Sequence, residues 1–305
     1  MNKPFFATID KPLGYDKILE DLANQINLNK FHPISLFTGD KGVGKRMICD
    51  YLAKEIIGES LNKFSHISYH PDILIIESLK ENIKKEIVIE QIREIKNFVS
   101  LTPSQAKNKL IIIDAIDQLN INSANAILKL LEEPNPNIYF LLVNHKIEIL
   151  LDTIISRCNK ILIPRLSKED FFRILANKKI DSDQELLHDI FAAKPGQAIV
   201  FYENKGLEML NLLNCFFNKE VVLNKQILSD KFDFKNNPNS FRCFFPIVNY
   251  LISREIRKNN LDSLKIEKLA NFISEFNAEY HKSIAVNMDN YNFILTNLFK
   301  IEKIL

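Results

Sequence analysis

The residues with the clearest chemical potential lie in one short glycine-rich stretch. Residues 37–47 read FTGDKGVGKRM. Three of the 7 glycines of the chain lie in a window of six residues inside this stretch, at Gly39, Gly42 and Gly44. Glycines let backbone N–H groups converge on phosphate oxygens, and a following helix adds the positive end of its dipole. Lys45 would reach the terminal phosphates. The pattern predicts a phosphate-binding P-loop, and the alternative is an ordinary glycine-rich turn.

Two positions that metal-dependent hydrolysis requires hold unsuitable side chains. Arg46 stands where the P-loop pattern has a Ser or Thr hydroxyl that binds magnesium, and a guanidinium cannot bind a cation. Asp114 ends a second apolar run and suits a metal site, but Ala115 follows it where a water-activating glutamate is expected. Without a base, hydrolysis lacks its orienting group. Asp114 can equally be the polar end of a buried strand.

The elements around these residues follow an alternating pattern. Between residues 31 and 165, short apolar runs alternate with helical patterns, which is typical of strands and crossover helices in a mostly parallel sheet. A helix ended by Pro134 is expected where Ala124, Ile127, Leu128 and Leu131 recur at helical spacing. We expect the strands at residues 34–38, 73–76, 110–113, 138–143 and 160–163.

After Pro164 the strand pattern stops and only helices are predicted. Ser167 and Asp170 offer capping-box chemistry, and Pro195 opens a later helix. Residues 235–240 are expected to form a surface loop. The last helix is predicted to bury a stripe that consists of Tyr291, Ile294, Leu295, Leu298 and Phe299. The predicted fold class is therefore α/β with a helical C-terminal part.

Composition excludes several classes of protein. The 40 Lys and Arg against 38 Asp and Glu give a formal net charge of +2, which disfavours a DNA binder that grips phosphates by itself. A hydrophobic fraction of 46% is enough for a substantial core. No apolar run approaches the roughly 20 residues of a membrane span, and the N-terminal apolar patch is too short for a secretory signal. We expect a cytoplasmic protein whose four scattered cysteines are reduced.

Four segments together resemble a known family. They are the altered P-loop, residues 113–117 (IDAID), residues 122–134 (NSANAILKLLEEP) and residues 154–158 (IISRC). This set is similar to the delta-prime group of bacterial DNA polymerase III clamp-loader subunits, which belong to the AAA+ superfamily. The resemblance covers residues 1 to about 205. The last hundred residues match only in length and in being helical.

The resemblance implies an arrangement of domains and sites. It implies an AAA+ nucleotide-binding-like domain at residues 1–165, a small helical lid domain at 166–206 and a helical collar domain at 207–305. Arg157 matches the arginine that faces the nucleotide of a neighbouring subunit, an arginine finger; the alternative is a structural arginine that caps a short turn. Asn144 matches a polar sensor residue, or else simply ends a strand. Gln197 stands where active relatives have arginine.

The same resemblance also bears on which cofactors the chain binds. Many relatives carry a four-cysteine zinc module, but residues 57–69 contain no cysteine, so we expect no zinc and no other metal. Binding of ATP or ADP stays open. Lys45 and the loop amides remain, whereas Arg46 either compensates phosphate charge or blocks the site.

The resemblance implies a non-hydrolysing stator subunit of the clamp loader, without ATPase activity of its own. It would belong to a hetero-oligomer with the gamma or tau and delta subunits. The sliding clamp would be a weak or indirect partner, and primer-template DNA would be bound through the complex. One alternative is an active P-loop ATPase that uses Lys45 and Asp114 with unconventional metal ligation. Another is a regulatory binding module that keeps the fold only as a scaffold.

Overall fold

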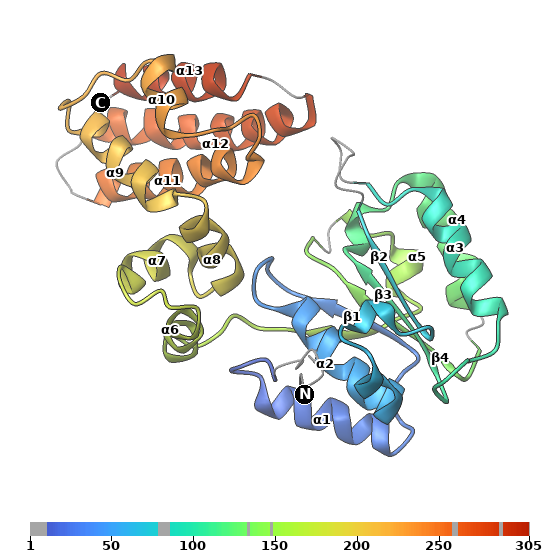
Figure 1. Cartoon of the computed structure of the whole chain (residues 1–305). Helices are drawn as coiled ribbons and strands as arrows, with labels where there is room; N and C mark the ends of the chain where they lie inside the picture. The colour runs from blue at the N-terminus through green and yellow to red at the C-terminus, as the bar shows by residue number, and fades with distance from the viewer. Residues whose placement is uncertain are drawn as a thin grey trace. The chain divides into compact units, whose positions relative to one another are not determined.

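A computed structural model describes residues 11–78, 86–132, 135–146, 149–257, 262–286 and 289–304 of the chain. The chain divides into two compact units, Met1–Ile174 and Leu175–Leu305. The first unit contains a sheet with helices around it, and the second is helical (Figure 1). Helix α6 (Lys168–Asn177) crosses the division.

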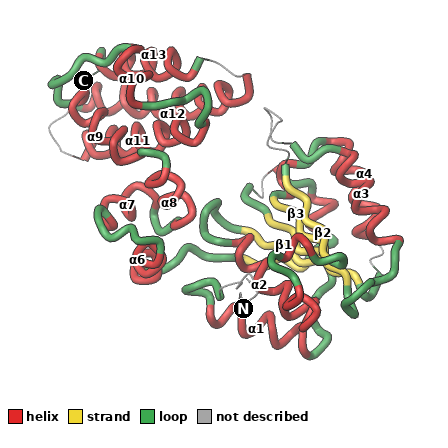
Figure 2. The backbone as a smooth tube through the Cα atoms, viewed as in Figure 1, coloured by secondary structure: helices red, strands yellow, loops and turns green. Residues whose placement is uncertain are grey.

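The sheet of the first unit has five parallel strands, in the order β2-β3-β4-β1-β5. Its strands are yellow in Figure 2. The order places β1 between β4 and β5, so the chain crosses over the sheet between successive strands. The strands are β1 (Ile34–Thr38), β2 (Ile73–Glu77), β3 (Lys109–Asp114), β4 (Ile138–Val143) and β5 (Asn159–Leu162). The predicted parallel sheet is confirmed.

Strand bounds differ from the prediction mainly at the edge of the sheet. Strands β1 and β4 begin and end where predicted, and β2 and β3 are slightly longer than predicted. The prediction for residues 160–163 is wrong by one residue, because β5 begins at Asn159 and ends at Leu162. This edge strand is largely exposed, so its hydrophobic pattern is weaker than that of the buried strands.

Helices cover both faces of the sheet. One face packs against α3 (Ile89–Ser100), α4 (Ile121–Glu132) and α5 (Asp152–Ile155) around a buried aliphatic core. On the other face, α2 (Lys45–Ile57) packs on β3 and β4, and α1 (Asp16–Asn27) packs on α2. Burial on both faces explains the nearly continuous hydrophobic runs of the strands. Pro134, the predicted end of α4, lies outside the described residues.

Short 3₁₀ helices connect these elements. They are η1 (Gly58–Lys63), η2 (Ile67–Tyr69) and η3 (Ile116–Gln118). The first two fill most of residues 58–69, and they bury Leu61 and Ile67. His70 follows them, with its Nε2 3.0 Å from the Ser60 hydroxyl and its ring edge-on to Phe64. Apolar and aromatic packing therefore holds this segment in place.

The second unit is a helical assembly with an aromatic core. Helix α11 packs against α7, α8, α9 and α12, and α13 packs against α10 and α12. Phe241, Phe276, Tyr280 and Phe293 form a contacting ring cluster in this core. The helices are α7 (Gln184–Phe191), α8 (Pro195–Glu203), α9 (Gly206–Phe217), α10 (Lys225–Lys231), α11 (Pro238–Arg257), α12 (Ser263–Val286) and α13 (Asn290–Glu302). The all-helical prediction is confirmed, and the three-domain boundaries at 165 and 206 stay predictions.

Two predicted helix starts are confirmed. The Ser167 hydroxyl accepts the Asp170 backbone N–H at 3.0 Å and donates to the Asp170 carboxylate at 2.8 Å, which caps α6. Pro195 occupies the first position of α8, where its missing N–H costs nothing.

Two predictions for the C-terminal part are corrected. The predicted loop at residues 235–240 is shorter, because α11 already begins at Pro238 and the Asn237 side chain accepts the backbone N–H of Asn239. The predicted stripe of α13 is wrong at Phe299, whose side chain is 55% exposed. The buried face is rotated by about one position and consists of Phe293, Ile294, Asn297, Leu298 and Ile301.

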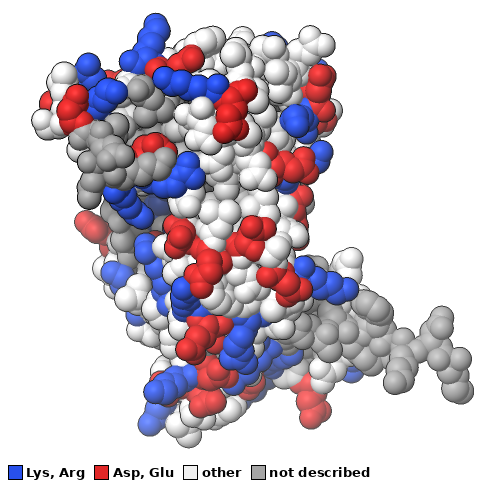
Figure 3. Space-filling model, turned by 90° about the vertical axis from the view of Figure 1, so that its left-hand side faces the viewer, with Lys and Arg blue, Asp and Glu red and all other residues white. Residues whose placement is uncertain are grey.

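The surface shows no concentration of one charge on the face that can be seen in Figure 3, where acidic and basic side chains are interspersed. This agrees with the formal net charge of +2. Within the described ranges, no helix combines the length and the apolar character that crossing a membrane requires. The four cysteines are free thiols.

Gly39 provides a test of the local packing. A Cβ at this position would lie 2.3 Å from the backbone oxygen of Ile163, and the φ of +137° is itself unfavourable for other residues. We expect Gly39→Ala to lower the free energy of unfolding by about 3 kcal/mol, from backbone strain and overpacking together. Gly44→Ala is the matched control, because Gly44 has a φ of +98° but no atom within 4 Å of its added Cβ. Urea unfolding should show the larger loss at Gly39, and equal losses would contradict the clash.

Candidate functional site

The carboxyl edge of the sheet brings together the residues predicted for the nucleotide site of this chain, whereas Arg157 lies elsewhere. Asp114 ends β3 and lies in register with Glu77 of β2 and Val143 of β4. Asn144 follows β4, and its backbone N–H donates to the Phe37 carbonyl of β1 at 2.9 Å. The P-loop leaves β1 at the same edge. Ligand sites of open parallel sheets occur at this edge, so the predicted residues share one location.

The glycine-rich loop has the strand–loop–helix geometry that the pattern predicts. Gly39, Gly42 and Gly44 have φ angles of +137°, +92° and +98°, a region in which other residues are strained. Gly44 is the N-cap of α2, so the loop ends at a helix N-terminus. Asp40 at the tip of the loop accepts from Arg165 Nε at 2.5 Å, which ties the loop to the segment after β5.

Lys45 is bound to its own loop. Its Nζ donates to the backbone carbonyls of Gly39 at 2.6 Å and Asp40 at 2.7 Å, and the residue is only 2% exposed. Burial lowers the pKa of Lys45 to about 8, against the attraction of Asp114 and other carboxylates. A phosphate at the loop would therefore have to share or replace these carbonyl contacts.

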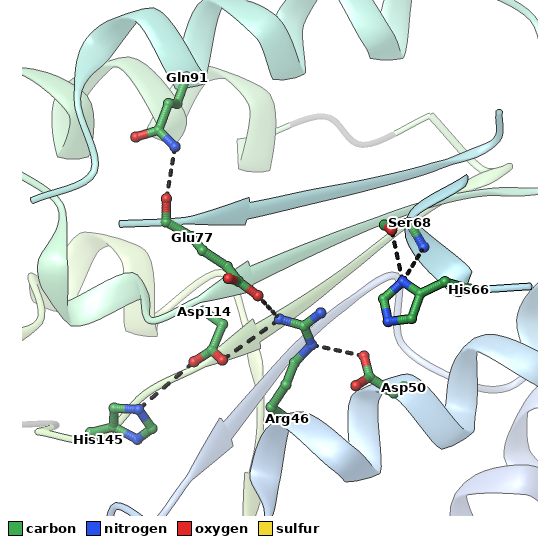
Figure 4. A network of polar contacts seen from close by, with 8 residues as sticks. All are labelled: Arg46, Asp50, His66, Ser68, Glu77, Gln91, Asp114 and His145. Atoms are coloured by element: carbon green, nitrogen blue, oxygen red, sulfur yellow. Dashed lines mark hydrogen bonds and ion pairs between the residues drawn. The ribbon is translucent and has the colours of Figure 1, made fainter. Parts of the chain in front are cut away.

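Arg46 lies among three carboxylates, as Figure 4 shows. Its Nε donates to Asp50 Oδ1 at 2.7 Å, one helical turn along α2. Its Nη1 donates to Glu77 Oε1 and lies 3.7 Å from Asp114 Oδ2. The three carboxylates come from α2, β2 and β3. The guanidinium thus supplies a positive charge to the acidic residues at this edge of the sheet.

Burial and charge act in opposite directions on this cluster. Burial raises the pKa of Asp50 and the pKa of Asp114, and in both cases the Arg46 charge opposes that rise. Burial also disfavours the charge of Arg46, but Asp50 and Glu77 together raise its pKa above the ordinary value. Arg46 is therefore a permanent cation, and desolvation opposes the charge of all three groups.

Asn144 and His145 complete the edge of the site. The Asn144 side-chain oxygen accepts the Lys146 N–H at 3.1 Å, while its buried Nδ2 has no hydrogen-bond partner among the described residues. His145 Nε2 lies 3.7 Å from Asp114 Oδ1, which is longer than a hydrogen bond. Burial, aided by the charges of Lys45 and Lys41, lowers the pKa of His145 to about 3. His145 is thus neutral at physiological pH, and this contact is not an ion pair.

This arrangement does not fit a magnesium ion. Position 46 supplies a guanidinium instead of a hydroxyl, and the carboxylates that could bind a cation already surround it. Ala115, beside Asp114, is buried and carries no base. Among the residues that the structure describes, no group of three or more His, Cys, Asp or Glu side chains could hold a metal ion. Position 46 therefore provides no hydroxyl to bind a metal ion, and position 115 provides no base to activate water.

Arg157 lies apart from this cluster, in the turn that follows the short helix α5. All three side chains of the Ser-Arg-Cys motif donate to carbonyls of α5: Ser156 Oγ to Thr153 at 3.2 Å, Arg157 Nη1 to Thr153 at 2.7 Å and Cys158 Sγ to Ile154 at 3.0 Å. The motif thereby adds side-chain donors to carbonyls at the helix end, where the Ile154 carbonyl also accepts the Arg157 backbone N–H at 3.2 Å. The Arg157 side chain remains 32% exposed.

Several residues of the site were not predicted from the sequence. Asp50 could have been found, because it lies four residues after Arg46 on a predicted helix. Glu77 and His145 have no local signal, because they meet Asp114 only through the pairing of the strands. Glu132 accepts from Arg157 Nη2 at 2.9 Å, although the two are 25 residues apart. Gln197 lies in the first turn of α8, as expected.

Comparisons with known proteins agree with this fold. A family model described as "DNA polymerase III, delta subunit" matches residues 14–167. The chain is 30% identical to DNA polymerase III subunit gamma of Buchnera aphidicola from Schizaphis graminum, over 91% of this chain and 74% of that protein. It is 32% identical to DNA polymerase III subunit delta' of Bacillus subtilis, over 61% of this chain and 64% of that protein.

A solved structure has the same overall fold. A DNA polymerase III gamma subunit-related protein of Thermotoga maritima superposes with a TM-score of 0.55 at 22% identity. The match covers 94% of this chain and 99% of that one. The fold, a parallel sheet with helices on both faces followed by helical parts, is thus shared with this gamma subunit-related protein.

The charge balance at Arg46 can be tested directly. Arg46→Met removes the guanidinium from three neighbouring carboxylates. We expect the free energy of unfolding at pH 7 to fall by about 2 kcal/mol. This loss is smaller than that for a fully buried ion pair, because the site is partly exposed. Without Arg46, the already raised pKa values of Asp50 and Asp114 rise further. The folded state then binds more protons than the unfolded state, so the deficit should shrink as the pH falls from 7 to 5.

The measurement is urea unfolding of both proteins across that pH range. Arg173→Met is the matched control, because Arg173 contacts Asp170 in an exposed pair and its loss should change stability by less than about 0.5 kcal/mol. A deficit that does not depend on pH would contradict the electrostatic explanation.

Proposed function

The chain belongs to the family of DNA polymerase III clamp-loader subunits that includes delta and delta-prime, and we propose that it is a non-hydrolysing stator of that assembly. The observation that carries this proposal is the guanidinium of Arg46 among Asp50, Glu77 and Asp114. An ATPase of this type needs a metal ion and an activated water near Asp114. This chain instead has a fixed cation at position 46 and a methyl group at position 115.

The proposed contribution of this subunit to catalysis is made to a neighbour. Arg157 would deliver its guanidinium to the γ-phosphoryl group of ATP bound by the adjacent subunit. Its place in the turn after α5 supports this role, since the side chain is partly exposed while α5 is anchored by fully buried Ile154. The P-loop and Arg157 would then belong to two different nucleotide sites, one in this subunit and one in its neighbour.

The proposed partners follow from the relatives, whose names are gamma, tau and delta' subunits of DNA polymerase III. We propose that the chain assembles with gamma or tau and delta subunits in the cytoplasm, and that its helical second unit forms part of a collar. The sliding clamp would be a weak or indirect partner, and primer-template DNA would be bound through the complex. The nearly balanced charge supports indirect DNA binding, because strong independent binding needs an excess of basic residues.

The proposal predicts the behaviour of the isolated protein. Purified protein should show no magnesium-dependent ATP turnover, and any binding of ATP or ADP should be equally strong with and without magnesium. The reason is that phosphate contacts through Lys45 and the loop amides do not require a metal. Phosphate release assays and calorimetric titration with and without MgCl₂ measure the two quantities. Turnover, or binding that magnesium strengthens tenfold, would favour the alternative of an ATPase with unconventional metal ligation.

A second prediction concerns Arg157 in the reconstituted complex. Arg157→Ala should preserve folding and assembly but remove ATP turnover at one site, where such arginines contribute roughly 10³ to 10⁵ in rate. Arg157→Lys should be nearly as harmful, because an ammonium does not reproduce the planar guanidinium. The loss for the whole complex will be smaller, since other sites remain active.

Clamp-stimulated ATPase and size-exclusion chromatography provide the two readouts. Arg93→Ala is the matched control, because Arg93 is an exposed arginine of α3 whose Nη1 lies 3.7 Å from the carboxylate of exposed Glu90. Unchanged assembly together with unchanged turnover in Arg157→Ala would show that Arg157 is structural.

A further inference from the structure

We propose that Glu132 is a positioning residue for Arg157, an inference that rests on the proposed function of Arg157 as an arginine finger. Glu132 is the last residue of α4, and Arg157 follows α5. Their side chains meet in one ion pair, with Arg157 Nη2 2.9 Å from Glu132 Oε1. The pair joins two sequence segments, the end of α4 and the Ser-Arg-Cys motif, that the fold brings together.

The guanidinium is held from two directions. Nη1 donates to the Thr153 carbonyl at 2.7 Å, and Nη2 donates to Glu132. A guanidinium has five N–H donors in a fixed plane, so these two bonds leave three donors for an anion. Two acceptors on different elements fix the orientation of the plane without using up its capacity to bind phosphate.

Both supports rest on the same rigid core. Leu131, beside Glu132, and Ile154, beside Thr153, belong to one buried cluster of the first unit. The Arg157 backbone N–H donates to the Ile154 carbonyl at 3.2 Å, while Thr153 and Glu132 hold the guanidinium at the tip of the side chain. An arginine side chain has several rotatable bonds, and restricting them before the neighbour binds favours the productive geometry.

The pair is suited to positioning rather than to stabilising the fold. The side chains of Arg157 and Glu132 are 32% and 51% exposed, and ion pairs at such sites contribute little to stability. Removing the Glu132 charge should therefore leave the subunit folded. A contrasting role would be a resting partner that keeps the guanidinium away from the neighbour's nucleotide, and it predicts faster turnover once Glu132 is changed.

The test uses complete clamp-loader complexes that carry Glu132→Gln, Glu132→Asp, Arg157→Ala or the Glu132→Gln, Arg157→Ala double change. The quantity of interest is the part of ATP turnover that Arg157→Ala removes. Glu132→Gln should lower the kcat of this part about tenfold with little change in KM, because misplacing a catalytic group slows the chemical step. Glu132→Asp should recover part of the loss. In the Arg157→Ala background, Glu132→Gln should have no further effect.

Assembly is checked by size-exclusion chromatography, and Glu90→Gln, which changes an exposed acidic partner of Arg93, is the matched control. Turnover equal to or faster than wild type in Glu132→Gln would overturn the positioning role while leaving the proposed function intact, provided that Arg157→Ala is impaired. An additive loss in the double variant would also overturn it. If Arg157→Ala itself has full turnover, the proposed function fails first.

Discussion

The positive charge on Arg46 lies among the acidic residues at the carboxyl edge of the sheet. Asp50, Glu77 and Asp114 come from three different elements, and the guanidinium contacts all three. A bound metal ion would provide such charge only when the ion is present, whereas a guanidinium is always charged. Arg46 therefore supplies a permanent positive charge to these carboxylates without any ligand, and its contacts link α2, β2 and β3.

Two arginines of the first unit, Arg46 and Arg157, thus differ in burial and in the groups that they contact. Arg46 is largely buried and directed at carboxylates of its own chain, whereas Arg157 lies at the surface with most of its N–H donors unassigned. The planar fork suits both settings, since it can satisfy several acceptors at once or bind an external anion. In the proposed function, the first arginine closes the subunit's own site and the second serves a neighbouring one.

The sequence was most informative where local patterns decide the structure. Buried strands such as β1 and β4 were predicted to the residue because both faces are apolar, and the P-loop was predicted from its glycines. The edge strand β5 was shifted because an exposed strand has a weak pattern. Phe299 was misplaced because a one-residue rotation of a helix moves a large apolar side chain to the surface. Local patterns carry no information on contacts such as Arg46 with Glu77 or Arg157 with Glu132, which depend on tertiary packing.

The close approach of Gly39 to the backbone of Ile163 means that the fold itself requires this glycine, whether or not phosphate binds. Lys45 likewise donates to two backbone carbonyls of its own loop. Both residues therefore have a structural role that does not depend on catalysis. Under the proposed function, the side chains at positions 46 and 115, and not the glycine-rich loop with its lysine, indicate whether the chain hydrolyses ATP.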